Sequence, residues 1–205
     1  MVFNARDHIA VDTLAGRDAQ DGIAIRSDLL PPTTHGSNIR GIVDREIWDA
    51  LRIPVCAAAG NRCEICGERS TRNGRSSRPD CHEKWVFEFR DDRPVQRLQR
   101  LIAVCQGCHQ VQHSGLARVK GLEHEVIARL CRINRWSREQ SDADLDRSSA
   151  RSSYLDQFDW DLDLSVLRGQ LVLRDYPEMY VPARDRARLG NSFFGIPPRG
   201  EGTPR

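Results

Sequence analysis

Two short motifs, Cys63-Glu-Ile-Cys66 and Cys105-Gln-Gly-Cys108, are expected to decide how this chain folds, and residues 67–104 separate them. A Cys-x-x-Cys turn places two sulfurs on the same side of a tight loop, which provides half of a tetrahedral Zn²⁺ site. Two such turns complete a closed four-cysteine site, and the pair is far more specific than one turn alone. We therefore predict a structural Zn²⁺ bound by these four cysteines.

The chain has 205 residues, of which 39% are hydrophobic and 29% are charged. This composition predicts a modest apolar core, so a bound metal would contribute a real share of the folding free energy. The seven cysteines indicate metal ligands and buried thiols in a reducing compartment, with a disulfide framework as the alternative. Because no apolar run approaches the length of a membrane span and the N-terminus has no signal-peptide pattern, we predict a cytoplasmic protein.

The formal net charge is only +2, but the charges are unevenly distributed. Residues 61–120 contain twelve Lys or Arg and seven Asp or Glu, a formal +5 that four thiolates and one Zn²⁺ reduce to +3. Residues 141–164 contain two Arg and seven Asp, a formal −5. Positive charge therefore surrounds the predicted zinc site, and an acidic segment follows it.

Composition and periodicity divide the chain into four segments. Residues 1–43 have little periodicity and contain Pro31-Pro32, so we expect a partly ordered N-terminal arm. Residues 44–120 form the zinc domain, and residues 121–189 a C-terminal helical region with an acidic strand. Residues 190–205 are rich in Gly, Pro and Arg, which predicts a disordered tail.

The zinc domain is expected to contain a helix, a hairpin and a second, short helix. Asp44 is typical of an N-cap, and Pro54 is expected to interrupt the helix that Asp44 opens. Aromatic residues at every second position after Asp80 predict a strand, followed by a turn and a return strand. The expected ranges are 91–94 for the turn, 95–104 for the return strand and 108–114 for the short helix, which closes at Gly115.

The C-terminal region shows a helical pattern and then an alternating one. Residues 122–133 place apolar side chains on one helical face, and a further helix is expected over 137–158. Residues 158–164 alternate apolar side chains with aspartates, which predicts a half-buried strand with an acidic face toward solvent. The whole chain is therefore expected to be an α+β protein with helices flanking a zinc-bound core.

The first knuckle is followed by a polar loop, residues 67–79, that contains four arginines. The loop is either a solvated, mobile connection or a surface that contacts phosphate groups of a nucleic-acid backbone. The arginines concerned are Arg69, Arg72, Arg75 and Arg78.

Three histidines are expected to meet beside the zinc knuckles. His109 and His113 have the four-residue spacing that places two side chains on one helical face, and the hairpin can bring His82 to the same place. A metal held there would polarise a scissile phosphate while a neutral imidazole deprotonates the attacking water. The alternatives are a zinc-knuckle neighbour for His109, a helix C-cap for His113 and an ordinary strand histidine for His82.

The order of these motifs resembles the HNH endonuclease (ββα-metal) domain in its zinc-knuckle form. The resemblance rests on Cys63-x-x-Cys66, Asp80-Cys81-His82-Glu83 and Cys105-x-x-Cys108-His109-x-x-x-His113, and covers about residues 44–120. It implies a small hairpin–helix core stapled by the four cysteines. It also implies that His82 is the general base. The implied ligands of a second metal (Mg²⁺, Mn²⁺, Ni²⁺ or Zn²⁺) are His109 and His113, together with Cys81 or Asp80.

The chain departs from the family pattern at two positions. Cys81 is a soft thiol where the family usually has Asp or His, which favours Zn²⁺ over Mg²⁺. Arg100 stands where the family has an asparagine that braces the hairpin, with Gln96 and Gln99 nearby. Either Gln99 replaces that asparagine or the catalytic site has decayed.

The leading hypothesis is an HNH-type endonuclease that hydrolyses phosphodiester bonds, with DNA as the expected partner. The alternative is a catalytically decayed HNH-fold zinc module that binds nucleic acid or a protein, and the acidic residues 141–164 are the expected surface for a protein partner. In either case we expect phosphate contacts from Arg69, Arg72, Arg75, Arg78 and Arg100.

Overall fold

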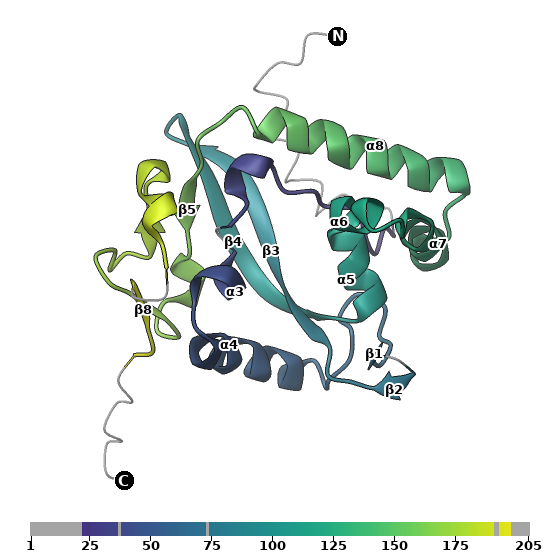
Figure 1. The fold of residues 1–205 in the computed structure, drawn as a ribbon, viewed down its shortest axis with the longest axis horizontal. Helices are drawn as coiled ribbons and strands as arrows, with labels where there is room; N and C mark the ends of the chain where they lie inside the picture. The colour runs from purple at the N-terminus through teal and green to yellow at the C-terminus, as the bar shows by residue number, and fades with distance from the viewer. Residues whose placement is uncertain (1–21, 37, 73, 191–192, 198–205) are drawn as a thin grey trace.

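The computed structural model describes residues 22–36, 38–72, 74–190 and 193–197, and shows a mixed α+β protein. Its centre is a four-stranded sheet in the order β3-β4-β5-β7 (Figure 1). β3 and β4 form a long antiparallel hairpin, β5 pairs with β4 in parallel, and β7 pairs with β5 in the antiparallel direction. The strands are β3 (Asp80–Arg90), β4 (Arg93–Val104), β5 (Asp161–Asp163) and β7 (Tyr180–Val181).

The predicted hairpin is confirmed. Side chains on β3 point alternately to the two faces of the sheet, which explains how the hairpin packs against the core. Trp85 and Phe87 point into the larger apolar cluster, where the Phe87 ring lies edge-on to Trp160 at 4.9 Å between centroids. The turn consists of Asp91 and Asp92, both with positive φ, a conformation that aspartate tolerates better than most residues. The return strand therefore begins two residues earlier than expected, at Arg93.

Helix α4 (Arg45–Ala58) begins as predicted, because the Asp44 side chain accepts a hydrogen bond of 2.9 Å from the Ile47 amide. The expected interruption at Pro54 is wrong, since the helix continues through it. Proline removes one helical hydrogen bond, but Trp48 and Leu51 bury the apolar face of α4 in the core. That burial outweighs one missing bond on an exposed side of the helix.

The short helix after the second knuckle is divided into two. Cys105 precedes α5, which ends before His113, and a separate helix then includes Gly115. The later helix and strand are shorter than expected, because the chain turns at residues 156–160. Helix α8 starts with a capping box formed by Ser137 and Gln140. The helices are α5 (Gln106–Gln112), α6 (Ser114–Val119), α7 (Glu123–Asn134) and α8 (Arg138–Leu155).

The described part of the expected N-terminal arm packs into the molecule. Ile39 is fully buried, in a segment that contains a 3-10 turn and the helix α3. Residues 24–33, here called the strap, run along α8, whose polar side chains bind the strap backbone. The Ser27 amide donates to Asp144 at 2.7 Å and the Leu29 amide to Ser148 at 2.9 Å. The two elements are η1 (Pro32–Thr34) and α3 (Ile39–Ile42).

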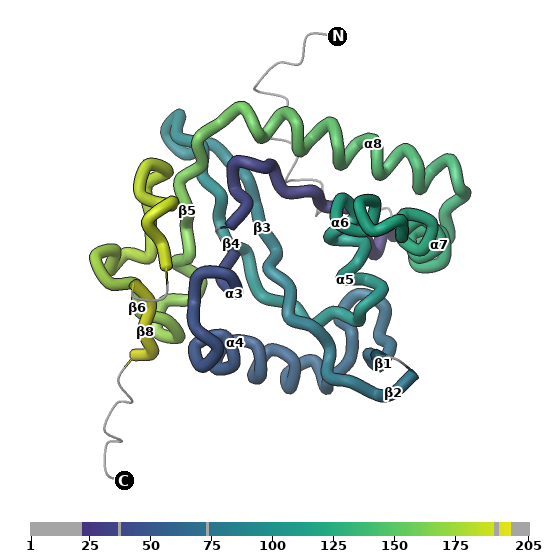
Figure 2. The backbone as a smooth tube through the Cα atoms, viewed as in Figure 1, coloured from purple at the N-terminus to yellow at the C-terminus, as the bar shows by residue number. Residues whose placement is uncertain are grey.

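The remaining elements are short. The expected loop 67–79 contains a two-stranded ribbon, and Phe194 is buried in a strand where a disordered tail was expected. β6 lies beside β8 on the side of the molecule opposite α7 (Figure 2). The rest of the predicted arm and tail, residues 1–21, 37, 191–192 and 198–205, lies outside the described residues. The short elements are β1 (Thr71–Arg72), β2 (Arg75–Ser76), η2 (Ser165–Leu167), β6 (Val172–Leu173), η3 (Ala183–Arg188) and β8 (Phe194–Gly195).

The aspartates expected on a solvated strand face are mostly used inside the protein. Asp163 is buried and accepts from Arg90 at 2.7 Å. Asp161 accepts from the Tyr180 hydroxyl at 2.6 Å and from the Ala183 amide at 2.8 Å. The expected acidic face is therefore wrong for these two residues. Among the described helices, none has the length and apolar character needed to cross a membrane.

Candidate metal centres

The four knuckle cysteines meet at one point, as the sequence predicts. Their sulfur atoms all lie within 4.8 Å of one another, and all but Cys66 are buried. Gly67 has a positive φ and its amide donates to the Cys63 carbonyl at 2.8 Å, which closes the first knuckle. Cys105 and Cys108 come from the end of β4 and the first turn of α5. Four sulfurs at this separation are compatible with a structural Zn²⁺.

Glu64 fixes the first knuckle to the hairpin. Its amide donates to the Ala103 carbonyl at 2.9 Å, and its carboxylate accepts from the Ala103 amide at 2.8 Å. The other carboxylate oxygen accepts from Arg100 at 2.6 Å. Arg100, which the sequence placed among the phosphate contacts, is thus engaged in an ion pair that joins β4 to the zinc knuckle.

A guanidinium group from α7 covers the cysteine cluster. The Nη2 atom of Arg129 lies 2.9 Å from the Cys105 sulfur, 3.0 Å from Cys66 and 3.3 Å from Cys108. Glu68 accepts from Arg129 at 3.0 Å and also binds Arg132 at 2.8 Å. A Zn²⁺ ion with four thiolates would carry a formal charge of −2. The positive charge of Arg129 beside the sulfurs would offset part of it. No pattern in the sequence points to Arg129, which lies 21 positions beyond Cys108.

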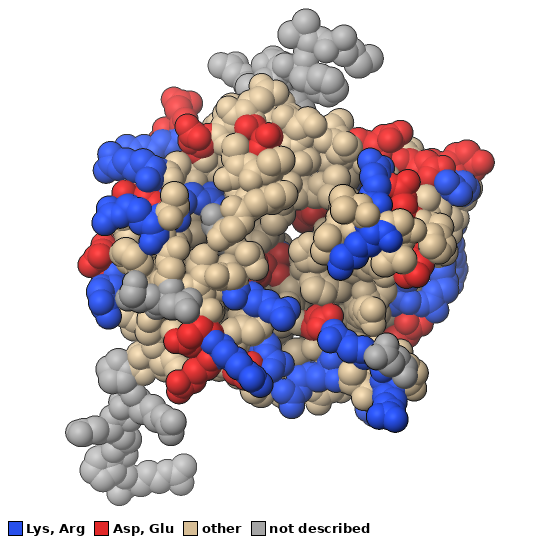
Figure 3. Space-filling model, in the orientation of Figure 1, with Lys and Arg blue, Asp and Glu red and all other residues tan. Residues whose placement is uncertain are grey.

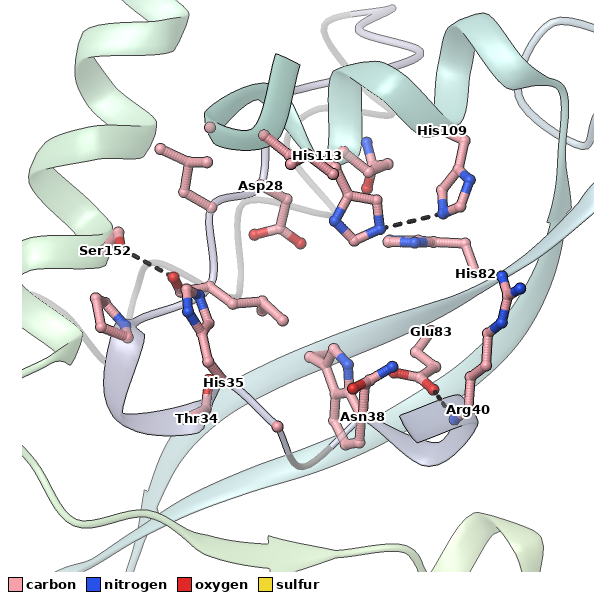
Figure 4. A pocket seen from close by; sticks show the side chains of 18 of the residues that line it. Asp28, Thr34, His35, Asn38, Arg40, His82, Glu83, His109, His113 and Ser152 are labelled. Atoms are coloured by element: carbon pink, nitrogen blue, oxygen red, sulfur yellow. Dashed lines mark hydrogen bonds between the residues drawn. The ribbon is translucent and has the colours of Figure 1, made fainter. Parts of the chain in front are cut away.

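The three histidines also meet, next to the cysteines: His82 comes from β3, His109 from α5 and His113 from the end of α5. Their candidate ligand atoms lie within 4.8 Å of one another. The Nε2 atoms of His109 and His113 are 3.1 Å apart, and the His82 ring centroid is 5.3 and 5.1 Å from those of His109 and His113 (Figure 4). Tetrahedral metal sites with Zn–N distances near 2.0–2.1 Å place ligand nitrogens roughly 3.3 Å apart, so the arrangement fits a shared divalent ion.

The surroundings keep two of these imidazoles neutral. Burial, followed by the neighbouring His113 and His109, holds the pKa of His82 well below its usual value. His113 is exposed over part of its surface, yet the burial of its ring, together with His109, lowers its pKa to about 4. Metal ions bind the neutral form of histidine, so these rings need lose no proton at neutral pH.

Asp80 orients one imidazole from behind and does not join the ligand group. Its Oδ2 atom lies 3.2 Å from His109 Nδ1, which leaves the Nε2 atom of His109 facing the other rings. This hydrogen bond lowers the pKa of Asp80. A carboxylate in that position fixes the tautomer of a metal-binding histidine.

Cys81 is not brought to the histidines, contrary to the expectation that it is a metal ligand. Side chains alternate along a strand, so Cys81 points away from the face that carries Asp80 and His82. It packs against the larger apolar cluster, and burial raises the pKa of its thiol to about 12.

The arginines of the loop 67–79 remain at the surface. All four are exposed, and Arg72 forms an ion pair with Asp80 at 3.3 Å. Figure 3 shows Lys and Arg side chains along the edge of the molecule formed by α4 and the β1–β2 ribbon, below a central hollow. The loop thus presents positive charge beside the histidine site. The four residues are Arg69, Arg72, Arg75 and Arg78.

A cavity of about 680 Å³ adjoins the histidines. Its walls come from β3, α5, α6 and the strap, which contributes Asp28, Leu29 and Leu30. Glu83 also lines it, but its carboxylate is buried and accepts from the Arg40 amide at 3.4 Å. Burial raises the pKa of Glu83 to about 7. No local sequence pattern predicts the strap, because its bonds to α8 join residues more than 100 positions apart.

Comparisons of the chain with protein-family models, with curated proteins and with solved structures find no match.

Proposed function

We propose that this protein is a metal-dependent endonuclease of the HNH (ββα-metal) type, which hydrolyses phosphodiester bonds in DNA. One observation carries the proposal: three imidazoles from a hairpin and the following helix share one point beside a four-cysteine cluster. The order strand, strand, helix agrees with the order of motifs that resembles that family. An open site of nitrogen ligands next to a closed site of sulfur ligands is typical of one working metal and one structural metal.

The residues fit two different ions. The four thiols suit a structural Zn²⁺, and three imidazoles suit Zn²⁺ or Ni²⁺ better than Mg²⁺. When bound at the imidazoles, a divalent ion would polarise the phosphate and stabilise the leaving oxygen. Because the His82 ring is buried among the other two and belongs to the same group of ligand atoms, we assign it to the metal. This replaces the general-base role that the family resemblance implied.

The surface around the site suits a polyanion. Arg69, Arg75 and Arg78 are exposed, and Arg40 stands where the cavity opens toward α4. Arginines at such positions would neutralise backbone phosphates and would release counterions on binding, which makes the affinity salt-dependent. This pattern favours nucleic acid over a neutral small substrate.

Plasmid cleavage tests the proposal. The wild-type protein should nick supercoiled plasmid with Zn²⁺, Ni²⁺, Mn²⁺ or Mg²⁺, and His82→Ala should abolish nicking while the melting temperature stays nearly unchanged. His124→Ala is the matched control, because His124 is exposed on α7 and outside the cluster. Cleavage that survives in His82→Ala at the wild-type rate would contradict the proposal.

A non-catalytic nucleic-acid module is the second candidate, and the position of Cys81 favours it. The chain lacks the usual Asp or His ligand at that position, and the thiol that replaces it packs elsewhere. Under this alternative, no metal supports cleavage, but salt-sensitive DNA binding survives in His82→Ala. A protein partner at residues 141–164 has less support, because Asp144, Asp161 and Asp163 are engaged inside the protein.

A further inference from the structure

Two consecutive polar contacts connect the β1–β2 ribbon to the histidine cluster. The Nη2 atom of Arg72 donates to Asp80 Oδ1 at 3.3 Å, and Asp80 Oδ2 lies 3.2 Å from His109 Nδ1. Asp80 is the first residue of β3, the strand that carries His82. In Figure 1 the ribbon lies next to α5, at the end of the hairpin where β3 begins. A change at Arg72 can therefore act on a candidate metal ligand through a single carboxylate.

Asp80 shares one negative charge between these two partners. A carboxylate behind a metal-binding histidine strengthens that ligand, because its negative charge stabilises the positive charge that a metal ion induces in the ring. The guanidinium of Arg72 offsets part of this charge and places a positive charge behind the imidazole, which disfavours a nearby cation. The hydrogen bond with His109 lowers the pKa of Asp80, and the charge of Arg72 lowers it further. The carboxylate therefore stays ionised with or without Arg72, and no proton has to move.

The contact between Arg72 and Asp80 is weak enough to be exchanged. The side chain of Arg72 is 63% exposed and that of Asp80 is 25% exposed, and an ion pair so open to water contributes at most about fivefold to an equilibrium constant. The strand register also places Arg75 directly opposite Arg72, where like charges repel each other. Arg75 forms no ion pair with any residue that the structure describes. A phosphate group beside these two guanidinium groups would relieve the repulsion.

The ribbon is held at its base and polar along its length. The Ser77 amide donates to the Ser70 carbonyl at 2.9 Å, their hydroxyl groups are 3.2 Å apart, and Ser70 is buried. The strand residues of the ribbon are all exposed, and none of them is apolar. The ribbon thus offers no apolar surface to a protein partner, whereas its arginines suit the phosphates of a nucleic-acid backbone.

We propose that a bound nucleic-acid backbone takes Arg72 away from Asp80 and thereby tightens the binding of a divalent metal at the histidine cluster, an inference that rests on the proposed function. With Arg72 on a phosphate, the whole charge of Asp80 supports His109. The coupling is reciprocal, so a metal at the histidines raises the affinity for the nucleic acid by the same factor. The substrate thereby helps to complete the site that cleaves it.

Calorimetric titration with Ni²⁺ tests the connection without DNA, in the full-length protein with zinc retained at the cysteines. Arg72→Gln should raise the Ni²⁺ affinity about threefold, because Asp80 then serves His109 alone. Arg75→Gln is the matched control, since it removes the same charge from the paired strand without a contact to Asp80, and it should leave the affinity unchanged. In an Asp80→Asn background, Arg72→Gln should have no effect, whereas a direct action of Arg72 on the metal would survive there.

The same titration with a saturating short DNA duplex tests the effect of the substrate, and a nicked duplex is still a polyanion. The duplex should raise the Ni²⁺ affinity of the wild-type protein and of Arg75→Gln about fivefold, and that of Arg72→Gln less than twofold. Equal Ni²⁺ affinities of the two variants without DNA, or an undiminished increase with DNA in Arg72→Gln, would overturn the role of Arg72. A protein that shows the coupling but cuts no DNA with any metal would instead overturn the proposed function. A wild-type protein that binds no second metal ion would overturn both.

Discussion

The two clusters lie next to each other and each takes a residue from α5, yet they differ in almost every physical property. Cys108 and His109 are consecutive residues; Cys108 is fully buried, while His109 faces its partners beside a cavity. The cysteine cluster is enclosed by the hairpin, Glu64 and Arg129, which occupy the space around the sulfurs. The histidine cluster has three candidate metal ligands and open space beside them.

This difference shows how one short helix can serve structure and chemistry together. A closed shell of four ligands leaves no position for water or substrate, whereas a three-ligand shell beside a cavity leaves one. Rotation by one residue along α5 is enough to separate the two environments, because consecutive helical side chains point in directions about 100° apart. Variants of each cluster should therefore fail in different ways.

Opening the cysteine cluster should have the largest effect. Cys66→Ser removes one thiolate, and structural zinc contributes on the order of 10 kcal/mol in small zinc domains, comparable to the whole stability of a typical protein. We expect an insoluble or unfolded protein, measured by soluble yield and circular dichroism. Cys131→Ser, a partly buried thiol outside the cluster, is the control. A soluble Cys66→Ser protein with wild-type melting temperature would contradict the structural role.

Truncation at the histidine cluster should leave the fold intact but remove its metal. His113→Ala should reduce the metal content from two equivalents to one, because an open site with two imidazoles binds far more weakly. Cleavage should fall by roughly three orders of magnitude, since metal polarisation of the phosphate is lost. Mass spectrometry of the native protein and a nicking assay measure the two effects. One equivalent of metal in the wild-type protein would show that the ion is purely structural.

Removing the guanidinium should weaken the cysteine cluster without opening it. Arg129→Met deletes the hydrogen bonds to three sulfurs, so zinc should transfer to a chelating dye about tenfold faster. Arg132→Met is a close control, because Arg132 binds Glu68 alone in this region. Equal transfer rates in the two variants would mean that Arg129 has no effect on the zinc.

The smallest effect is expected from a substitution of Asp80, the carboxylate that holds the His109 ring. Asp80→Asn keeps an oxygen that can accept a hydrogen bond from His109 but removes the negative charge, so affinity for the second metal should fall by about tenfold. Calorimetric titration with Zn²⁺ or Ni²⁺ measures this, with Asp91→Asn in the exposed hairpin turn as the control. A loss of cysteine-bound zinc in Asp80→Asn would show that the two clusters are coupled.

Sequence patterns were sufficient for the parts of the site that are close in the chain. The spacing of the cysteines predicts the knuckles, and the alternation from Asp80 to Phe89 predicts the hairpin. The same alternation could have excluded Cys81 as a ligand, because residues 81 and 82 point to opposite faces of a strand. The error at Pro54 came from local propensity, which the packing of Trp48 and Leu51 overrides.

The sequence by itself determined that the four cysteines meet and that His109 and His113 lie on one face with His82 nearby, because turn geometry and helical spacing act over a few residues. Only the tertiary structure decided which distant groups surround them. The strap meets α8 across more than 100 residues, and α8 holds it with a buried face of serines and Asp144 that carries no apolar periodicity. Such contacts depend on the packing of the whole chain, and no local pattern records them. Arg129 reaches the cysteine cluster, and Asp28 the wall of the histidine cavity, in this way.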